Sequence, residues 1–415
     1  MKWLAALCAL LLLADVIYAE ERASTASSIP ASRAKVSREP VGRADLTEER
    51  WIDRVRAQNS ELFQFEGIKV ENGQRIWSYR LSIVETEHVL GDGAADVGRG
   101  SGAGTGNVAG ANGVSYKVWA YGGTVPAPTL VVREQDVMRI QVTNETSTEH
   151  TIHSHGLFVP QRMDGVPHAH GKHRPEGGDA PHHMPMAIPP GESFTYEYTA
   201  RPAGTHWYHC HVNTNEHLKR GMAGALIVLP KTPDPPTDCD EILLLQEWNS
   251  SYARGGQPGN PREQGASDWF TINGLSYPQT RSIHMEPGQL CRLRVINGGS
   301  QFHSMHLHGH SFLVTHKDGA RIPEPMEMDT VPVGPGERVD LLVLGNNPGE
   351  WPLHCHDPTH QTNAGAYPGG MMTHLFVGSD PSPASVDGPI GGSMEEVRQW
   401  WKRGDRARPM KITTR

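Results

Sequence analysis

Residues 204–212 are Gly-Thr-His-Trp-Tyr-His-Cys-His-Val, and the tripeptide His209-Cys210-His211 within this stretch organises the whole sequence. Neighbouring side chains of an extended strand point to opposite faces, whereas residues two apart share a face. A cysteine between two histidines can therefore place its thiolate in one metal site and both imidazoles in another. The same tripeptide occurs again as His354-Cys355-His356. Each copy is expected to connect two metal sites.

The sequence around the two tripeptides is an internal duplication. Residues 137–156 match residues 290–309 with a constant offset of 153, and each segment ends in a histidine-rich motif of the form H-x-x-H-x-H-G. Gly191, Gly204 and the first tripeptide match Gly336, Gly349 and the second with an offset of 145. Because the offsets differ by eight, the first repeat is expected to carry eight extra residues between Phe158 and Gly191.

Both repeats show the period-two pattern of strands with one buried face. Met138, Ile140 and Val142 alternate with polar residues, and Leu293 and Val295 alternate with arginines. The high content of glycine (45) and proline (32) also favours strands over helices. We therefore expect a β-rich fold of two repeated units in tandem, with one short helix near residues 394–402.

The N-terminus has the features of a secretory signal, namely Lys2, an apolar run from Trp3 to Leu13 and the small residue Ala19 at a plausible cleavage site. The run is too short for a membrane span, so a secreted or periplasmic protein is expected. Residues 20 to about 60 are polar and are expected to be irregular, as a lead-in or as an arm that packs on a partner. The expected organisation is a signal peptide (1–19), an N-terminal extension (20–65), a first domain (66–230), a proline-rich linker, a second domain (239–380) and a C-terminal tail (381–415).

The net charge of −8, with no basic cluster, argues against nucleic acid as a partner. Two of the five cysteines, Cys239 and Cys291, lie outside the tripeptides and the signal. They could form a disulfide, which export permits, or Cys291 could be a buried free thiol on the inward face of its strand. The residues alone leave both possibilities open.

Each repeat contains a set of two histidines, one cysteine and one methionine, which is the ligand set of blue copper sites. The first set is His150, Cys210, His217 and Met222, and the second is His303, Cys355, His360 and Met371. Met371 is preferred to Met372 because the pattern G-M-x-x-x-L-x-V aligns it with Met222. Met371 lies eleven positions after His360, whereas Met222 lies five positions after His217, so residues 361–369 must fold back to deliver Met371.

Eight further histidines remain, four from each repeat: His153, His155, His209 and His211, and His306, His308, His354 and His356. With these motifs the sequence resembles the multicopper oxidases, most closely their two-domain, laccase-like members. The resemblance implies an all-β fold of two cupredoxin-like Greek-key β-sandwich domains in tandem. It also implies about five copper ions per chain, in type 1, type 2 and type 3 sites. It implies type 2 ligation by His153 and His306 and type 3 ligation by the other six. It also implies homotrimers with the trinuclear clusters between subunits.

The resemblance implies one-electron oxidation of phenolic or aromatic amine donors at type 1 copper, with dioxygen reduced to water at the trinuclear cluster. Cys210 and Cys355 would pass the electrons to the adjacent histidines, and Asp164 resembles the family's acid near type 2 copper. The alternatives are a metal-ion oxidase for cuprous or ferrous ions, a copper nitrite reductase and a non-catalytic copper-binding protein. A structural zinc site fits poorly, because zinc favours closed tetrahedral sets.

The extra residues of the first repeat fall in a loop, 168–186, that is rich in histidine and methionine. This loop could recruit copper or a cuprous substrate, or it could be a solvated loop with incidental histidines.

Overall fold

The computed structural model describes residues 48–91, 113–167, 187–250, 267–378 and 391–404, all of which belong to one compact unit. The expected signal peptide, the loop 168–186, and most of the N-terminal extension and the C-terminal tail lie outside these residues. Among the helices of the described ranges, none has the length and apolar character needed to cross a membrane.

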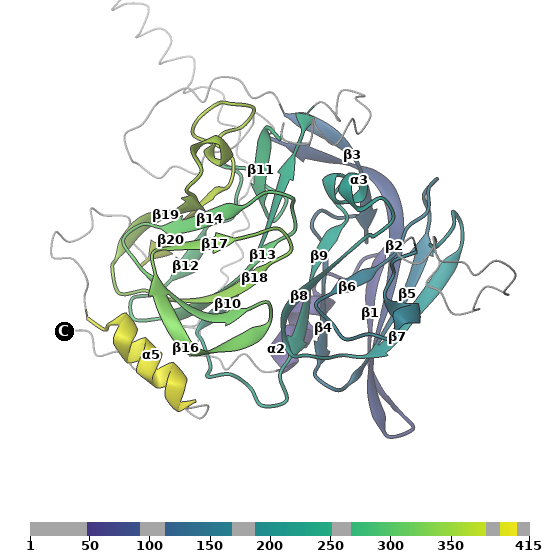
Figure 1. The fold of residues 1–415 in the computed structure, drawn as a ribbon, viewed down its shortest axis with the longest axis horizontal. Coiled ribbons are helices and arrows are strands. Elements are labelled where there is room, and N and C mark those ends of the chain that lie inside the picture. Colours follow the sequence, from purple (N-terminus) through teal and green to yellow (C-terminus); the bar gives the residue numbers. More distant parts are fainter. Residues whose placement is uncertain (1–47, 92–112, 168–186, 251–266, 379–390, 405–415) are drawn as a thin grey trace, which may run out of the picture. The chain divides into compact units, whose positions relative to one another are not determined.

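The first sandwich consists of two sheets that face each other across a hydrophobic core (Figure 1). One sheet contains β1 (Phe63–Glu71), β2 (Gln74–Leu90), β3 (Val114–Tyr121), β5 (Val137–Asn144) and β7 (Ser193–Thr199), and the other contains β4 (Ala127–Arg133), β6 (His153–His155), β8 (Gly204–His209) and β9 (Ala223–Leu229). The side chains of Met138, Ile140 and Val142 are fully buried, as their alternation predicted.

The second sandwich repeats this arrangement with a core of its own. Its larger sheet contains β10 (Cys239–Trp248), β11 (Trp269–Ile272), β13 (Leu290–Asn297), β15 (Phe312–Lys317), β16 (Ala320–Met328) and β18 (Arg338–Leu344), and the other contains β12 (Ile283–Met285), β14 (His303–Leu307), β17 (Thr330–Val333), β19 (Gly349–Cys355) and β20 (Met372–Val377). The all-β fold of two tandem sandwiches is confirmed.

Equivalent strands pair in the same register within each of the two sandwiches. Strand β2 runs parallel to β5 with Ile83 opposite Asn144, and β10 runs parallel to β13 with Leu245 opposite Asn297. In the facing sheets His153 lies opposite His209, and His306 lies opposite His354. Residues related by the offsets of 153 and 145 therefore occupy equivalent positions in the two sandwiches.

The expected eight-residue excess in the first repeat is the net difference between two insertions, one in each repeat. The Nδ1 atom of His153 lies 2.8 Å from the backbone oxygen of Asp164, and that of His306 lies 2.9 Å from the backbone oxygen of Asp329. Asp164 and Asp329 are thus equivalent, with an offset of 165. In the second sandwich, the extra residues form the hairpin β15–β16 before Asp329. In the first sandwich, the extra residues of the sequence come after Asp164.

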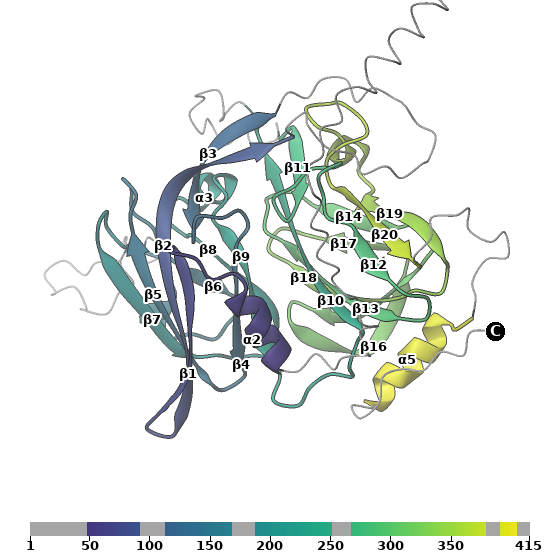
Figure 2. The same ribbon diagram turned by 180° about the vertical axis from the view of Figure 1, so that it is seen from behind.

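The expectation of an irregular segment up to about residue 60 was wrong for the part that the structure describes. Residues Glu48–Arg56 form α2, and Trp51 and Val55 on one face of this helix are buried. Figure 2 shows α2 beside β4. The helix also reaches the second sandwich, because the Arg294 guanidinium lies 5.4 Å from the ring centre of Trp51 and Arg54 donates to the backbone oxygen of Asp240.

The question of Cys239 and Cys291 is settled in favour of a disulfide. The two residues lie opposite each other on the parallel strands β10 and β13, with Cα atoms 4.6 Å apart. Near the C-terminus, the expected short helix is present as α5 (Met394–Arg403), which begins with a capping box between Ser393 and Glu396.

Candidate metal centres

The first thiolate site lies inside the first sandwich. Cys210 follows the last residue of β8, and His217 lies on the short helix α3 (Thr214–Lys219). The Cys210 Sγ atom is 3.0 Å from Nδ1 of His217 and 3.8 Å from Nδ1 of His150, and the two Nδ1 atoms are 3.2 Å apart. All three side chains are buried, and so is Met222, whose backbone N–H donates to the carbonyl of His217.

The second thiolate site has nearly the same geometry. The Cys355 Sγ atom is 3.3 Å from Nδ1 of His360 and 3.9 Å from Nδ1 of His303, and these nitrogens are 3.1 Å apart. His360 lies on the 3₁₀ helix η3 (Pro358–Gln361). The loop 361–369 folds back, because the N–H of Met371 donates to the carbonyl of His360 as in the first site. The Met371 side chain is fully buried.

The two sites differ in their electrostatics. In the first, burial and then the neighbouring His217 lower the pKa of His150 to about 3, and burial raises the pKa of Cys210. In the second, burial acts to lower the pKa of His303, but hydrogen bonding to Cys355 and Glu247 outweighs it and raises the pKa to about 9. The pKa of Cys355 falls to about 6, since hydrogen bonds from His303 and His360 outweigh its burial.

The first set of four histidines lies on the opposite side of the first His-Cys-His tripeptide from its thiolate site. The ring centre of His153 is 5.1 Å from that of His209, 5.3 Å from that of His211 and 5.7 Å from that of His155. The metal-binding atoms of His153, His155 and His209 all lie within 4.8 Å of one another. Trp207 stacks on both His155 and His209 and so holds the two rings in place.

The second set has the same layout at the surface of the second sandwich. The ring centre of His306 is 4.9 Å from that of His308 and 5.4 Å from that of His356. The Nε2 atoms of His308 and His354 are 3.0 Å apart. His308 and His356 are exposed, and His354 is buried.

In both sets the histidine before the cysteine is oriented by its own backbone. The Nδ1 atoms of His209 and His354 each lie 2.9 Å from the carbonyl oxygen of the following cysteine. Because Nδ1 is used in this way, Nε2 is the nitrogen left to bind a metal. Burial and then the neighbouring His153 lower the pKa of His209 well below its usual value, which favours the neutral imidazole that a metal requires.

Asp164 lies on the outer side of His153, where its carboxylate Oδ1 is 3.3 Å from Nδ1. Its counterpart Asp329 escaped the sequence analysis, although the pattern M-D-x-V-P at residues 163–167 and 328–332 could have revealed it. The hairpin β15–β16 shifts the second copy and hides the match from a search at constant offset.

The eight histidines form two separate sets. Within the described ranges, every ring contact among them joins two histidines of the same sandwich. The sequence therefore predicted which side chains come together within each repeat, but the eight imidazoles do not converge within one chain.

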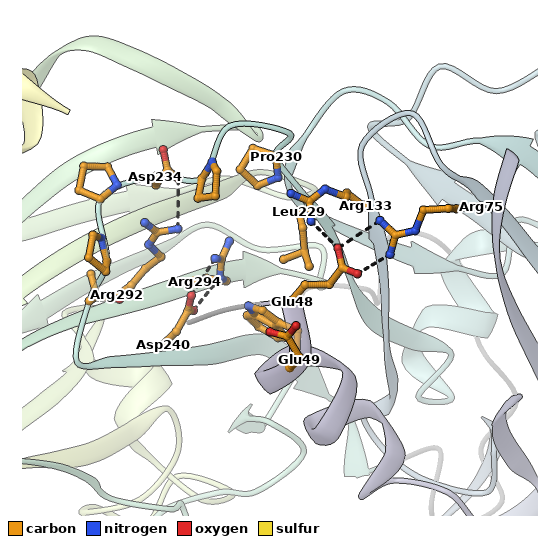
Figure 3. Close-up of a pocket in the computed structure, with 15 residues that line it drawn as sticks. Glu48, Glu49, Arg75, Arg133, Leu229, Pro230, Asp234, Asp240, Arg292 and Arg294 are labelled. Atoms are coloured by element: carbon orange, nitrogen blue, oxygen red, sulfur yellow. Dashed lines mark hydrogen bonds and ion pairs between the residues drawn. The ribbon is translucent and has the colours of Figure 1, made fainter. Parts of the chain in front are cut away.

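A cavity of about 510 Å³ lies elsewhere, between α2, β13 and the linker (Figure 3). Ion pairs join its charged side chains, including Arg75 and Arg133 with Glu48, Arg292 with Asp234, and Arg294 with Asp240. Among the described residues that line it, none is a histidine or a cysteine. We therefore read this cavity as part of the junction between the sandwiches and not as a metal site.

Comparison with known proteins agrees with this architecture. A family model described as multicopper oxidase matches residues 103–233, and a second with the same description matches residues 255–377. The chain belongs to the multicopper oxidase family, and its cofactor is copper.

Among solved structures, the blue copper oxidase of Nitrosomonas europaea is 34% identical, with 81% of this chain and 96% of that chain covered and a TM-score of 0.60. The multicopper oxidase mgLAC is 36% identical, with 74% and 87% covered and a TM-score of 0.60. The multicopper oxidase MmcO of Mycobacterium tuberculosis is 28% identical over 269 residues, which are 56% of this chain and 49% of that protein. The chain thus spans about half the length of this curated relative.

Proposed function

We propose that this protein is a laccase-like multicopper oxidase that couples one-electron oxidation of phenolic or aromatic amine donors to the four-electron reduction of dioxygen to water. The observation that carries the proposal is the duplicated pair of sites: each sandwich contains a buried Cys-His-His set and, across the same strand, a set of four histidines.

The residues fit copper. A buried thiolate, two imidazoles and a thioether form the soft ligand set of blue copper, and clustered neutral imidazoles suit copper as well. Bound there, copper would supply one-electron transfer at the thiolate sites and dioxygen reduction at the histidine sets. We propose the first ligand set as His150, Cys210, His217 and Met222, and the second as His303, Cys355, His360 and Met371.

The chain itself connects the two kinds of site. Cys210 is covalently joined to His209 and His211, and Cys355 is joined to His354 and His356. An electron that enters at a thiolate therefore has a short path through covalent bonds to the histidine set. Because these cysteines are buried, solvent and bulky donors are kept from the thiolate itself.

Asp164 has two parts in this proposal. Its backbone oxygen fixes the orientation of His153, and its carboxylate lies beside the same ring nitrogen. A carboxylate in that position can exchange protons with water and transfer them to the histidine set, where dioxygen reduction would consume them. Asp329 supplies the same backbone contact to His306, so it is the second candidate for this role.

The separation of the two histidine sets supports a homotrimer in which each trinuclear cluster forms between subunits. His308 and His356 are exposed imidazoles, and the first set offers half-buried ones. A head-to-tail ring brings the first set of one subunit against the second set of the next, so that three chains complete three clusters.

The mature protein is proposed to act outside the cytoplasm, in the periplasm or the medium. The signal-like residues 1–19 motivate this proposal, and the Cys239–Cys291 disulfide is compatible with an oxidising compartment.

Copper content and donor range test the proposal. After copper loading and removal of loosely bound ions, about five copper ions per chain are expected from two thiolate sites and one trinuclear cluster. About four would mean that one thiolate site is empty, and about two would contradict the oxidase and favour a nitrite reductase.

The rival within the family is a cuprous or ferrous oxidase. Oxygen uptake with a phenol, at four donors oxidised per dioxygen, supports the laccase-like reading. Uptake only with cuprous or ferrous ions would replace that reading with the metal oxidase, and copper binding without oxygen uptake would leave a binding protein.

A further inference from the structure

The two thiolate sites differ in the group that faces the outer nitrogen of their first histidine. Nε2 of His150 lies 2.9 Å from the hydroxyl of Thr146, whereas Nε2 of His303 lies 3.5 Å from a carboxylate oxygen of Glu247. Taking the proposed function as given, we propose that Glu247 is a positioning residue that sets the reduction potential of the second thiolate site below that of the first.

The duplication provides the same glutamate in both sandwiches. The strand pairings place Glu85 two residues after Ile83 and Glu247 two residues after Leu245, at equivalent positions. Glu85 accepts a hydrogen bond of 2.7 Å from the Ser147 hydroxyl, and Glu247 accepts one of 2.6 Å from Ser300. The carboxylate and its serine are therefore shared features, and they do not by themselves distinguish the two sites.

One residue decides whether the carboxylate reaches the histidine. The offset of 153 makes Gly299 the counterpart of Thr146. A Cβ atom built on Gly299 would lie 1.8 Å from Oε2 of Glu247, so any side chain there would displace the carboxylate. The backbone of Gly299 is outside the left-handed region, and the need for glycine thus comes from the carboxylate.

The environment of the two glutamates differs accordingly. Glu85 is exposed, while Glu247 is only 4% exposed. Oε2 of Glu247 and Nε2 of His303 are both buried, and neither has another hydrogen-bond partner among the residues that the structure describes. A buried polar atom without a partner is costly, so these two atoms are each other's natural partners. In the second site Nδ1 of His303 faces the thiolate, which leaves the proton on Nε2, towards the carboxylate.

A cation from the first sandwich lies close to this carboxylate. Lys219 is buried in the segment between His217 and Met222, and its charge is attracted to Glu247. Both side chains line a small cavity of about 30 Å³. Lys219 offsets part of the carboxylate's charge, but the polarisation of His303 through its N–H remains.

A carboxylate that accepts the N–H of a ligating histidine makes the imidazole a stronger donor to its metal. Together with the negative charge in a medium of low dielectric, this stabilises the oxidised site. The first site has a neutral hydroxyl in the same place and therefore keeps the higher potential. Each site takes one electron from a donor, so the first can accept from weakly reducing phenols, while the second requires stronger reductants.

The experiment measures the midpoint potential of each thiolate–copper chromophore separately. Cys210→Ser leaves only the second chromophore, and Cys355→Ser leaves only the first. In spectroscopic redox titrations the second is expected to have the lower potential. In the Cys210→Ser background, Glu247→Gln is expected to raise that potential by about 59 mV or more, which is a tenfold change in the equilibrium constant for a one-electron couple.

The matched control is Glu85→Gln in the Cys355→Ser background, which is expected to leave the first potential unchanged. Gly299→Ala is a second test of the same idea, because its methyl group displaces the carboxylate without removing it. Gly299→Ala is expected to raise the potential of the second site as Glu247→Gln does. If Glu247→Gln does not bind copper, the potential of Gly299→Ala alone tests the role of Glu247.

If the role of Glu247 were purely structural, the two variants would have lower stability or copper content, and the potential of the second site would be unchanged. A blue absorption with unchanged potential in both variants overturns this inference alone. If neither single-cysteine background shows a thiolate–copper absorption, the proposed function fails, and this inference fails with it.

Discussion

The Thr205 hydroxyl donates a hydrogen bond of 2.7 Å to the carboxylate of Asp340 and so joins β8 of the first sandwich to β18 of the second. Arg294 extends this link, because its guanidinium lies 2.8 Å from the Thr205 hydroxyl and 3.4 Å from the Asp340 carboxylate. All three side chains are buried. Since β8 leads into the first tripeptide, the network also supports the site.

We expect Asp340→Ala to lower the free energy of unfolding by about 3–5 kcal/mol, because it leaves Arg294 buried with an incomplete set of partners. Urea unfolding of the copper-free protein measures the change. The control is Glu324→Ala, whose carboxylate pairs with Lys402 and is 74% exposed, and which should leave the midpoint nearly unchanged. Equal effects of the two substitutions would contradict a special role for the buried network.

His206 should make the copper-free protein sensitive to acid. Burial and then the Arg338 guanidinium lower the pKa of His206 to about 4. Between about pH 6.5 and pH 4 the unfolded state binds a proton that the folded state does not. The contribution of His206 to the free energy of unfolding is therefore fully present above about pH 6.5. It is lost as the pH falls towards 4, and the loss is up to about 3 kcal/mol.

The measurement compares the pH dependence of unfolding for the wild type and His206→Gln. The glutamine amide can still donate to the Pro202 carbonyl, which lies 3.0 Å from Nε2 of His206. The variant should lose less stability on acidification than the wild type. Parallel curves would show that His206 is not the group responsible.

The disulfide should stabilise the second sandwich without affecting copper binding. Cys239 and Cys291 are 52 residues apart in sequence, a loop for which chain entropy predicts about 4 kcal/mol. We expect the double substitution Cys239→Ala and Cys291→Ala to lower the unfolding free energy by about 2–4 kcal/mol, with the copper content unchanged. Loss of copper with unchanged stability would contradict this assignment.

Complementation between variants tests whether clusters form between chains. His155→Ala damages the first histidine set and His308→Ala damages the second, so each variant alone should lose oxygen reduction. In mixed rings about a quarter of the interfaces pair two intact sets, and refolding the variants together should restore activity in that proportion. Each variant refolded alone is the control, and light scattering reports the trimer. No recovery in mixed trimers would place the cluster within one chain.

Much of the site could be predicted from spacing, because the relevant residues are close together on strands. His153 and His155, or His209 and His211, share a face by the alternation of β-structure alone. The return of Met371 to its site was predicted by aligning a short motif, even though the loop before it is longer than in the first repeat.

Contacts between distant segments were harder to predict. The alternation indicates only that Arg292 and Arg294 lie on the face opposite Leu293 and Val295. Both arginines are buried, because Asp234, Asp240 and Asp340 come from other segments to pair with them. Likewise, nothing in a polar N-terminal stretch indicated that the ring of Trp51 would contact the two guanidinium groups of Arg54 and Arg294.

The helix α5 gives the second sandwich a third layer. Val397, Trp400 and Trp401 pack on Leu313 and Leu342, which lie outside the core that contains Cys355 and Met371. A truncated chain that ended at residue 378 would keep every proposed ligand but expose this strip of leucines to water. Such a chain would be prone to aggregate, so a second sandwich with this face covered requires the chain at least to the end of α5 at Arg403.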